Sequence, residues 1–248
     1  MSKEWDYVKH NTYYRVTRAG NAIRLYRNNV LHSQWNPKRP VSGKLWDLFL
    51  ISALGAKRDL SRILVLGAGG GSVINLIHTY FPDAYVDAID LDKVHLKVAK
   101  KFFGLNTSKC QLIHDDAQSW LKKYNGKKYD LIIDDVFTES ENIPFRSIQA
   151  KCEWMKQLLK NLNKNGVVVF NFADQKEWNK SRRAWKHLIG QFNVAIATHY
   201  LCENKIVHIS KNDISYKNVM KTLKENHCNN YLKYFNNGTI SYQSRKKQ

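Results

Sequence analysis

Hydrophobic and polar residues alternate through the segment Tyr13–Gln34, and short Gly- and Asn-containing turns interrupt the pattern. This alternation predicts a β-hairpin or a three-stranded meander, because successive side chains of a strand point to opposite faces. Pro37, Pro40 and Gly43 then mark a loop. The segment Lys44–Leu54 places its apolar residues at helical spacing and predicts a helix.

From Arg62 onward, short apolar runs alternate with amphipathic stretches. The runs predict strands over Ile63–Leu66, Ala84–Ile89, Gln111–His114, Tyr129–Asp134, Val167–Phe172, Val194–Thr198 and Lys205–Ser210. The stretches predict one helix that begins near Ser72 and another that ends at Tyr124. They also predict helices over Val94–Phe103, Ser147–Leu162, Trp178–Phe192 and Tyr216–Glu225. We expect a loop over Thr138–Pro144 and an irregular tail to Gln248.

Repeated strand–helix units predict an α/β fold, with a mostly parallel, Rossmann-like sheet that carries helices on both faces. The alternating N-terminal segment stands apart from this pattern. We therefore expect a small N-terminal β-domain over residues 1–43 and a Rossmann-like domain over residues 44–248.

The first strand–helix unit contains a glycine-rich turn, and the next strand ends in an acid. The turn, GAGGG, contains Gly67, Gly69, Gly70 and Gly71, and the acid is Asp90. Glycine permits a tight turn and a close ligand, and the N–H groups at the helix start favour polar or anionic ligand atoms. A carboxylate about 20 residues further on can accept hydrogen bonds from both ribose hydroxyls. A tight turn without a ligand is the alternative, but the acid favours a nucleoside site.

The spacing of the glycines bears on which nucleoside is bound. The dinucleotide fingerprint G-x-G-x-x-G/A requires Gly or Ala at position 72, where this chain has Ser72. The spacing G-x-G-G-G is closer to the G-x-G-x-G of S-adenosylmethionine sites. We therefore favour S-adenosylmethionine over NAD.

Further acids follow the predicted strands. Carboxylates are costly to bury unpaired, and ligands of parallel sheets lie at the carboxyl ends of the strands. Asp90, Asp116 and Asp135 all occupy such positions, and we interpret them as site residues. Each acid could instead cap the helix that follows, and this is our interpretation of Asp92 and Asp115.

The chain is strongly basic, with 40 Lys and Arg against 21 Asp and Glu and a formal net charge of +19. The excess lies in the segments before Arg62 and after Gln175. Such flanks suit an anionic partner such as nucleic acid, although a Lys- and Asn-rich amino-acid usage explains them equally well. An apolar leader and a membrane-length apolar run are both missing, and the four cysteines are scattered. We therefore expect a cytoplasmic protein without a disulfide framework or a metal site.

Several motifs resemble the spermidine/spermine synthase family, a branch of the class I S-adenosylmethionine-dependent methyltransferase fold. The similarity extends from Tyr13 to about Phe172 and includes RILVLGAGGGSV, VDAIDLDKVHLKVAKKFFG, CQLIHDDAQSWL and YDLIIDDVF. The N-terminal segment resembles the small β-domain of the family, which closes on a Gln, here Gln34. The resemblance also implies that homodimers are common.

The resemblance implies roles for individual residues. Asp90 would hold the ribose, Asp116 would accept from the adenine amino group, and Asp135 would lie beside the transferred group. The cofactor site would further include Gly67, Gly69, Gly70, Gly71, Leu91, Ala117 and Gln34. The cofactor would be S-adenosylmethionine or decarboxylated S-adenosylmethionine.

Departures from the family pattern bear on the reaction. Aminopropyltransferases usually carry an Asp in the glycine loop that clamps the amine of decarboxylated S-adenosylmethionine, and this chain has Gly70 there. The family's Tyr-Gln pair before the loop is Trp46-Asp47 in this chain. The sequence therefore favours a methyltransferase, with aminopropyl transfer to a polyamine as the alternative. A non-catalytic module that binds an anionic partner is the third possibility. The acceptor is left open between a small amine, a protein and a nucleic acid.

Overall fold

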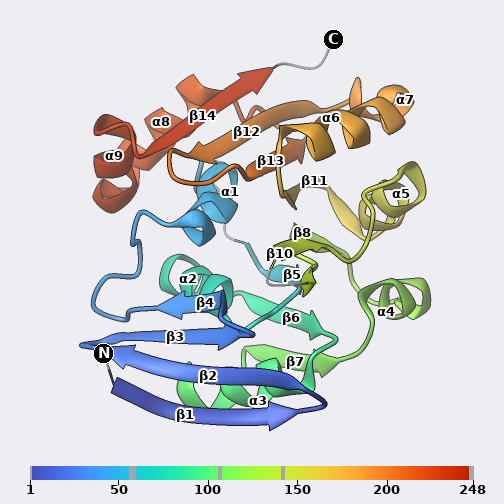
Figure 1. The fold of residues 1–248 in the computed structure, drawn as a ribbon. Coiled ribbons are helices and arrows are strands. Elements are labelled where there is room, and N and C mark those ends of the chain that lie inside the picture. The colour runs from blue at the N-terminus through green and yellow to red at the C-terminus, as the bar shows by residue number, and fades with distance from the viewer. Residues whose placement is uncertain (1, 56–59, 106–107, 141–142, 246–248) are drawn as a thin grey trace.

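The computed structural model describes residues 2–55, 60–105, 108–140 and 143–245 of the chain. A four-stranded antiparallel sheet at the bottom of Figure 1 runs in the order β1 (Ser2–Lys9), β2 (Thr12–Ala19), β3 (Ala22–Arg27) and β4 (Val30–Trp35). The meander predicted over residues 13–34 is confirmed. The additional strand β1 was not predicted. Nearly all of its side chains are exposed, so its sequence lacks the alternation of apolar and polar residues that marks a half-buried strand.

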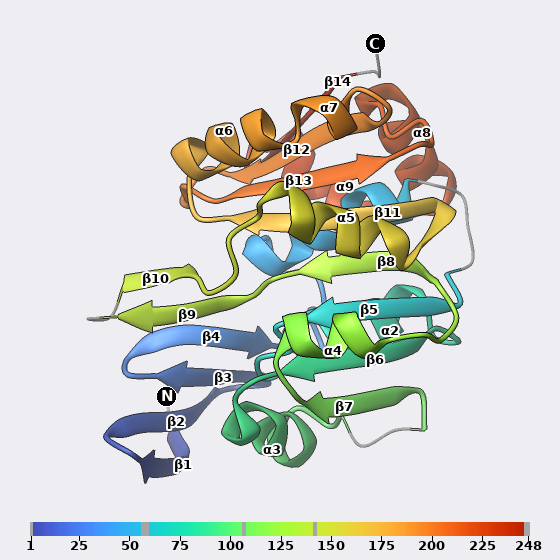
Figure 2. The same ribbon diagram turned by 90° about the vertical axis from the view of Figure 1, so that its right-hand side faces the viewer.

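The second sheet has eight strands and runs the height of the molecule (Figure 2). Its order is β14 (Ile240–Arg245), β12 (Asn193–His199), β13 (Lys205–Ser210), β11 (Leu162–Phe172), β8 (Tyr129–Asp134), β5 (Arg62–Leu66), β6 (Tyr85–Asp90) and β7 (Cys110–His114). The five strands from β11 to β7 are parallel, and β13, β12 and β14 extend the sheet in antiparallel fashion. The predicted fold class is confirmed.

Helices cover both faces of this sheet, which explains why its central strands are continuous apolar runs. One face, toward the viewer in Figure 2, carries α4 (Ala117–Lys123), α5 (Cys152–Lys160), α6 (Gln175–Ala184) and α7 (Lys186–Ile189). The other carries the 3-10 helix η1 (Leu45–Leu50), α1 (Ile51–Leu54), α2 (Ser72–Tyr80), α8 (Tyr216–Glu225) and α9 (Asn229–Asn236). Helix α3 (Lys93–Phe102) also packs against the N-terminal sheet through Val94 and Val98.

The loop predicted over Thr138–Pro144 is wrong. The chain forms a hairpin there, β9 (Phe137–Ser140) and β10 (Ile143–Arg146), and residues 141 and 142 at its tip lie outside the described residues. Its two strands pair only with each other, and this edge position tolerates the proline at 144, which has no N–H to donate.

The irregular tail is also a wrong prediction. Helix α9 and strand β14 lie there, and the buried side chains of Tyr231, Ile240 and Tyr242 anchor them to the core. The many Asn and Lys residues of this segment favoured the irregular prediction, so these three buried residues were not recognised.

Two predicted long helices are shorter than expected. Helix α5 begins only at Cys152, and the helix predicted over residues 178–192 breaks near Trp185 into α6 and α7.

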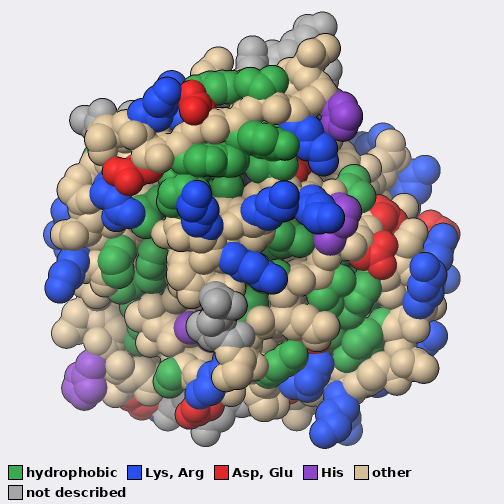
Figure 3. All heavy atoms as spheres, turned by 90° about the horizontal axis from the view of Figure 1, so that it is seen from below, with side chains coloured by type: hydrophobic (Ala, Val, Ile, Leu, Met, Phe, Trp, Pro, Cys, Tyr) green, Lys and Arg blue, Asp and Glu red, His purple; other side chains and the backbone are tan. Residues whose placement is uncertain are grey.

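The basic residues do not form one dense patch on the face seen from below. Lys and Arg side chains, blue in Figure 3, are spread over this face and alternate with hydrophobic and uncharged ones. None of the helices within the described residues combines the length and the apolar character that a membrane crossing requires.

Candidate functional site

The strands β5 and β8 lie side by side, and the chain leaves them in opposite directions along the sheet. This is a topological switch point, where ligands of α/β sheets bind. The glycine turn follows β5, and Asp135 follows β8. Gly67 has a φ angle of +87°, and a Cβ atom there would lie 2.1 Å from the Asp135 carbonyl oxygen. Glycine is therefore required for the two strand ends to approach each other.

Two adjoining cavities open at this edge. The large cavity, of about 430 Å³, is lined by residues that include Gly67, Asp90, Leu91, Asp116 and Ala117. The small cavity, of about 170 Å³, is lined by residues that include Ser33, Trp46, Gly69, Asp135 and Asn171. The residues that line both are His32, Gly67, Asp90, His95 and Phe137. The described His, Cys, Asp and Glu side chains form no group of three or more that could hold a metal ion.

Asp90 is fixed by the backbone at the boundary between the cavities. One carboxylate oxygen accepts from the Gly69 N–H and the other from the Asp92 N–H, each at 2.7 Å. A carboxylate offers about four lone-pair sites, so both oxygens keep capacity for ligand hydroxyls. The buried ring of His95 lies with Nδ1 3.6 Å from Asp90. Burial lowers the pKa of His95, but the neighbouring Asp90 and Asp92 outweigh it and raise that pKa above its usual value.

The roles of Asp115 and Asp116, the two acids after β7, differ from those predicted. Asp116, rather than Asp115, is the N-cap of α4, and its side chain accepts from the Ser119 N–H at 2.9 Å. Asp115 accepts from the backbone N–H of Asp116 at 2.8 Å. Both line the large cavity. Asp116 therefore caps a helix and also lines the cavity, and its adenine role stays a prediction. Asp92 caps α3 as expected and accepts from Val94.

The Asp134-Asp135 pair is split between the core and the cavity. Asp134 is completely buried and receives the Arg146 guanidinium, at 2.8 and 3.0 Å, together with the indole N–H of Trp154 at 2.7 Å. Asp135 lines the small cavity instead. Asp134 therefore binds other elements of the core to the end of β8, whereas Asp135 lies where a ligand in the cavity can contact it.

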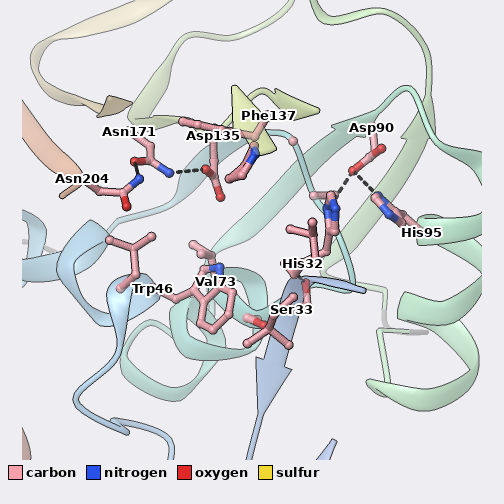
Figure 4. A pocket seen from close by; sticks show the side chains of 18 residues that line it. His32, Ser33, Trp46, Val73, Asp90, His95, Asp135, Phe137, Asn171 and Asn204 are labelled. Atoms are coloured by element: carbon pink, nitrogen blue, oxygen red, sulfur yellow. Dashed lines mark hydrogen bonds and ion pairs between the residues drawn. The ribbon is translucent and has the colours of Figure 1, made fainter. Parts of the chain in front are cut away.

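A row of polar side chains orients Asp135 (Figure 4). The side-chain amide of Asn171 donates to Asp135 at 2.8 Å, and Asn204 donates to Asn171 at 2.9 Å. Burial and the charge of Asp134 raise the pKa of Asp135 to about 7, against the opposing effect of Asn171. A carboxyl with this pKa can accept a proton near neutral pH.

A second polar group joins the N-terminal sheet to the hairpin. Glu139 on β9 accepts from His32 on β4 at 2.7 Å and pairs with Arg27 on β3 at 2.5 Å. Burial raises the pKa of Glu139, but His32 and Arg27 outweigh it and hold that pKa below its usual value. Burial lowers the pKa of His32. These contacts hold the N-terminal sheet against the cavities, with His32 lining both.

Three predicted cofactor residues line neither cavity. The Gly70 N–H donates to the Ser33 hydroxyl at 2.7 Å, and a Cβ atom at position 70 would lie 2.9 Å from the Ser33 Cβ. Gly71 packs against Leu105, and Gln34 accepts from Arg24 at 2.8 Å. An Asp side chain at position 70 therefore has no room in this backbone arrangement.

The sequence did not reveal several residues of the site: His32, His95, Phe137, Asn171 and Asn204. Asn171 follows the strand-end rule at β11 and could have been found that way. Asn204 directly precedes the antiparallel strand β13, and His32 belongs to the other sheet, so neither gives a local signal.

Comparisons with known proteins agree with this architecture. A family model described as the spermine/spermidine synthase domain matches residues 50–200. The polyamine aminopropyltransferase of Vibrio vulnificus (strain CMCP6) is 30% identical over 135 residues, which are 53% of this chain and 44% of that protein. The eEF1A lysine and N-terminal methyltransferase of Mus musculus is 35% identical over 78 residues, 30% of this chain and 11% of that protein. This chain thus spans less than half the length of both relatives.

Among solved structures, a probable spermidine synthase from Corynebacterium glutamicum ATCC 13032 superposes with a TM-score of 0.74 at 15% identity. The superposition covers 98% of this chain and 90% of that one. Human methyltransferase-like protein 13, solved in complex with SAH, gives a TM-score of 0.60 at 16% identity over 72% of this chain and 88% of its own. At these identities the likeness is one of fold.

Proposed function

Because the chain belongs to the spermine/spermidine synthase family, we propose that it transfers an alkyl group from an S-adenosyl sulfonium donor to an amine acceptor. The observation that carries this proposal is the position of Asp135. It lies at the switch point of the sheet, in a cavity that adjoins a larger one, and its pKa of about 7 suits a proton acceptor.

The large cavity fits the nucleoside part of such a donor. Its volume of about 430 Å³ lies within the range of small-molecule sites, roughly 300–1,000 Å³. Asp90 would hold the ribose hydroxyls, Asp116 would accept from the adenine amino group, and the exposed side chain of Leu91 would cover the ring. The human protein solved with SAH supports a nucleoside of this class.

When bound, the donor supplies a carbon atom bonded to a positively charged sulfur. The acceptor nitrogen forms a bond to that carbon as the carbon–sulfur bond breaks, and the bonding electron pair stays on sulfur. Asp135 takes the proton that the amine nitrogen loses, while Asn171 holds the carboxylate in place. Trp46 and Phe137 exclude water from the small cavity, which favours positioning and desolvation of the reactants.

Two observations bear on which group is transferred. The family and the Vibrio relative are named for aminopropyl transfer to polyamines, which makes aminopropyl the first group to test. Methyl transfer is the second candidate, because the position of the amine clamp, Gly70, is closed by Ser33. A methyltransferase also stands among the relatives. The preference for methyl transfer that the sequence suggested is therefore not confirmed.

The test is product analysis by mass spectrometry. The purified protein is incubated with 1,4-diaminobutane, n-butylamine or a primary-amine peptide, together with S-adenosylmethionine or its decarboxylated form. The proposal predicts an amine that is heavier by the transferred group, and one 5′-methylthioadenosine or S-adenosylhomocysteine released for each product. Absence of product from every pair, with protein that binds 5′-methylthioadenosine, would refute it.

A further inference from the structure

The small cavity has a polar end, a second polar part where His32, Asp90 and His95 adjoin the large cavity, and an apolar part. Asp135, Asn171 and Asn204 form the polar end (Figure 4). The apolar lining includes Val30, Leu31, Leu45, Trp46, Phe137 and Pro144. An acceptor with its amine at Asp135 therefore lies with its remaining atoms against hydrocarbon and aromatic rings.

The carboxylates near the cavity are already engaged. Among the described lining residues, only Asp90 and Asp135 are acidic. Asp90 accepts from two backbone N–H groups at the boundary with the large cavity, and in the proposed function its remaining capacity is taken by the ribose hydroxyls of the donor. Glu139, on the neighbouring hairpin, forms an ion pair with Arg27 and accepts a hydrogen bond from His32. With Asp90 holding the donor and Asp135 holding the reactive amine, no further carboxylate among the described lining residues of this cavity is left for a second ammonium group on the acceptor.

The outer end of the cavity is apolar as well. Leu31 on β4 and Pro144 on β10 both line it and are both exposed. The hydrogen bond between His32 on β4 and Glu139 on β9 holds β4 against the hairpin, and β9 pairs with β10, which carries Pro144. The apolar lining thus continues from Trp46 to the solvent, with room for a hydrocarbon tail.

We propose that the acceptor is a primary monoamine with an apolar tail rather than a diamine. The inference rests on the proposed function for the role of Asp135. Burial of an unpaired ammonium is costly, whereas each methylene removed from water adds about a fourfold gain in affinity. The cavity therefore selects an acceptor with one charge at its reactive end.

The test compares amines that share a carbon chain. Calorimetry of the whole protein, with and without 5′-methylthioadenosine, measures binding of n-butylamine and 1,4-diaminobutane, which differ only in the second ammonium. We expect n-butylamine to bind at least about tenfold more tightly, and n-hexylamine to bind about tenfold more tightly still. Equal or tighter binding of the diamine, or no binding of any of these amines, would overturn the inference.

A matched pair of variants places the effect in this cavity. Leu31→Glu adds a carboxylate at the outer end and is expected to shift the preference toward the diamine by about tenfold. Leu201→Glu adds the same charge at an exposed site that does not line the cavity and leaves the preference unchanged. An unchanged preference in Leu31→Glu contradicts the assignment.

The two proposals fail in different ways. Efficient transfer to the diamine in preference to the monoamines supports the proposed function and refutes the monoamine inference. Binding of n-butylamine that Leu31→Glu alters, without transfer from either donor, supports the inference and refutes the function.

Discussion

Replacement of Asp135 with Asn removes the proton acceptor of the proposed transfer while it keeps the shape of the side chain and an oxygen for Asn171. A positioned general base contributes about 10²–10⁴-fold to a rate. We therefore expect kcat/KM to fall by that factor, which corresponds to about 3–5 kcal/mol of transition-state stabilisation.

The pH profile gives a second readout of the same variant. Burial raises the pKa of Asp135 to about 7, so the reactive carboxylate is lost as the pH falls below that value. For the unaltered protein, kcat/KM should rise with pH and level off above about pH 7. This inflection should be absent in Asp135→Asn.

A stability measurement shows whether Asp135→Asn loses activity through its chemistry or through damage to the fold. The folded-state pKa of Asp135 lies above the ordinary value of 3.8, so its proton stabilises the fold at low pH and this contribution is lost as the pH rises to about 7. Asn never ionises. In urea at pH 8, Asp135→Asn should therefore be more stable by about 1–2 kcal/mol, after allowance for screening at the open side of the cavity. The difference should shrink toward pH 4.

The control is Asp83→Asn, which makes the same change at an exposed carboxylate paired with Lys109. It should leave activity, pH profile and stability nearly unchanged. Activity of Asp135→Asn within fivefold of the unaltered protein, or the same inflection near pH 7 in that variant, would refute the base assignment.

Two further predictions concern other contacts, and a third concerns the charge of the flanks. Arg146→Met leaves the buried Asp134 without its cation, and urea titration should show a loss of about 3–5 kcal/mol, which an unchanged midpoint would contradict. Gly70→Asp overpacks against Ser33 and should lower the free energy of unfolding by about 1–3 kcal/mol. It should not raise the affinity for decarboxylated S-adenosylmethionine, and adding Ser33→Gly should restore the stability. If the basic flanks bind an anionic partner, filter binding should retain RNA at low salt and lose it steeply as salt rises, and no retention at low salt would contradict that role.

The approach of Asp90 to the glycine turn could be predicted because it is local in sequence. Strand β5, the glycine turn, α2 and β6 form one strand–helix–strand unit, and their spacing alone brings Asp90 to the turn. The same strand-end rule selected Asp135. The prediction that Asp115 caps the helix was wrong, since adjacent acids after a strand offer the same local pattern and the structure has Asp116 as the cap.

The lining of the small cavity could not be predicted because it is assembled from distant segments. His32 and Glu139 are 107 residues apart, and their contact depends on the packing of two separate sheets. Asn204 reaches Asn171 only through the antiparallel pairing of β13 with β11, a register that hydrophobic pattern does not specify. The strand β9 is short, and nothing in its sequence indicated the partner that makes it a hairpin.

The central claim is that the large cavity binds an S-adenosyl nucleoside through Asp90, and calorimetry tests it most directly. S-Adenosylhomocysteine and 5′-methylthioadenosine are titrated into the unaltered protein and into Asp90→Asn. We predict binding of at least one nucleoside to the unaltered protein and a loss of about 1–3 kcal/mol in the variant, as for hydrogen bonds to a charged acceptor. Equal affinity in both proteins, or no heat from the unaltered protein with either nucleoside, would contradict the account.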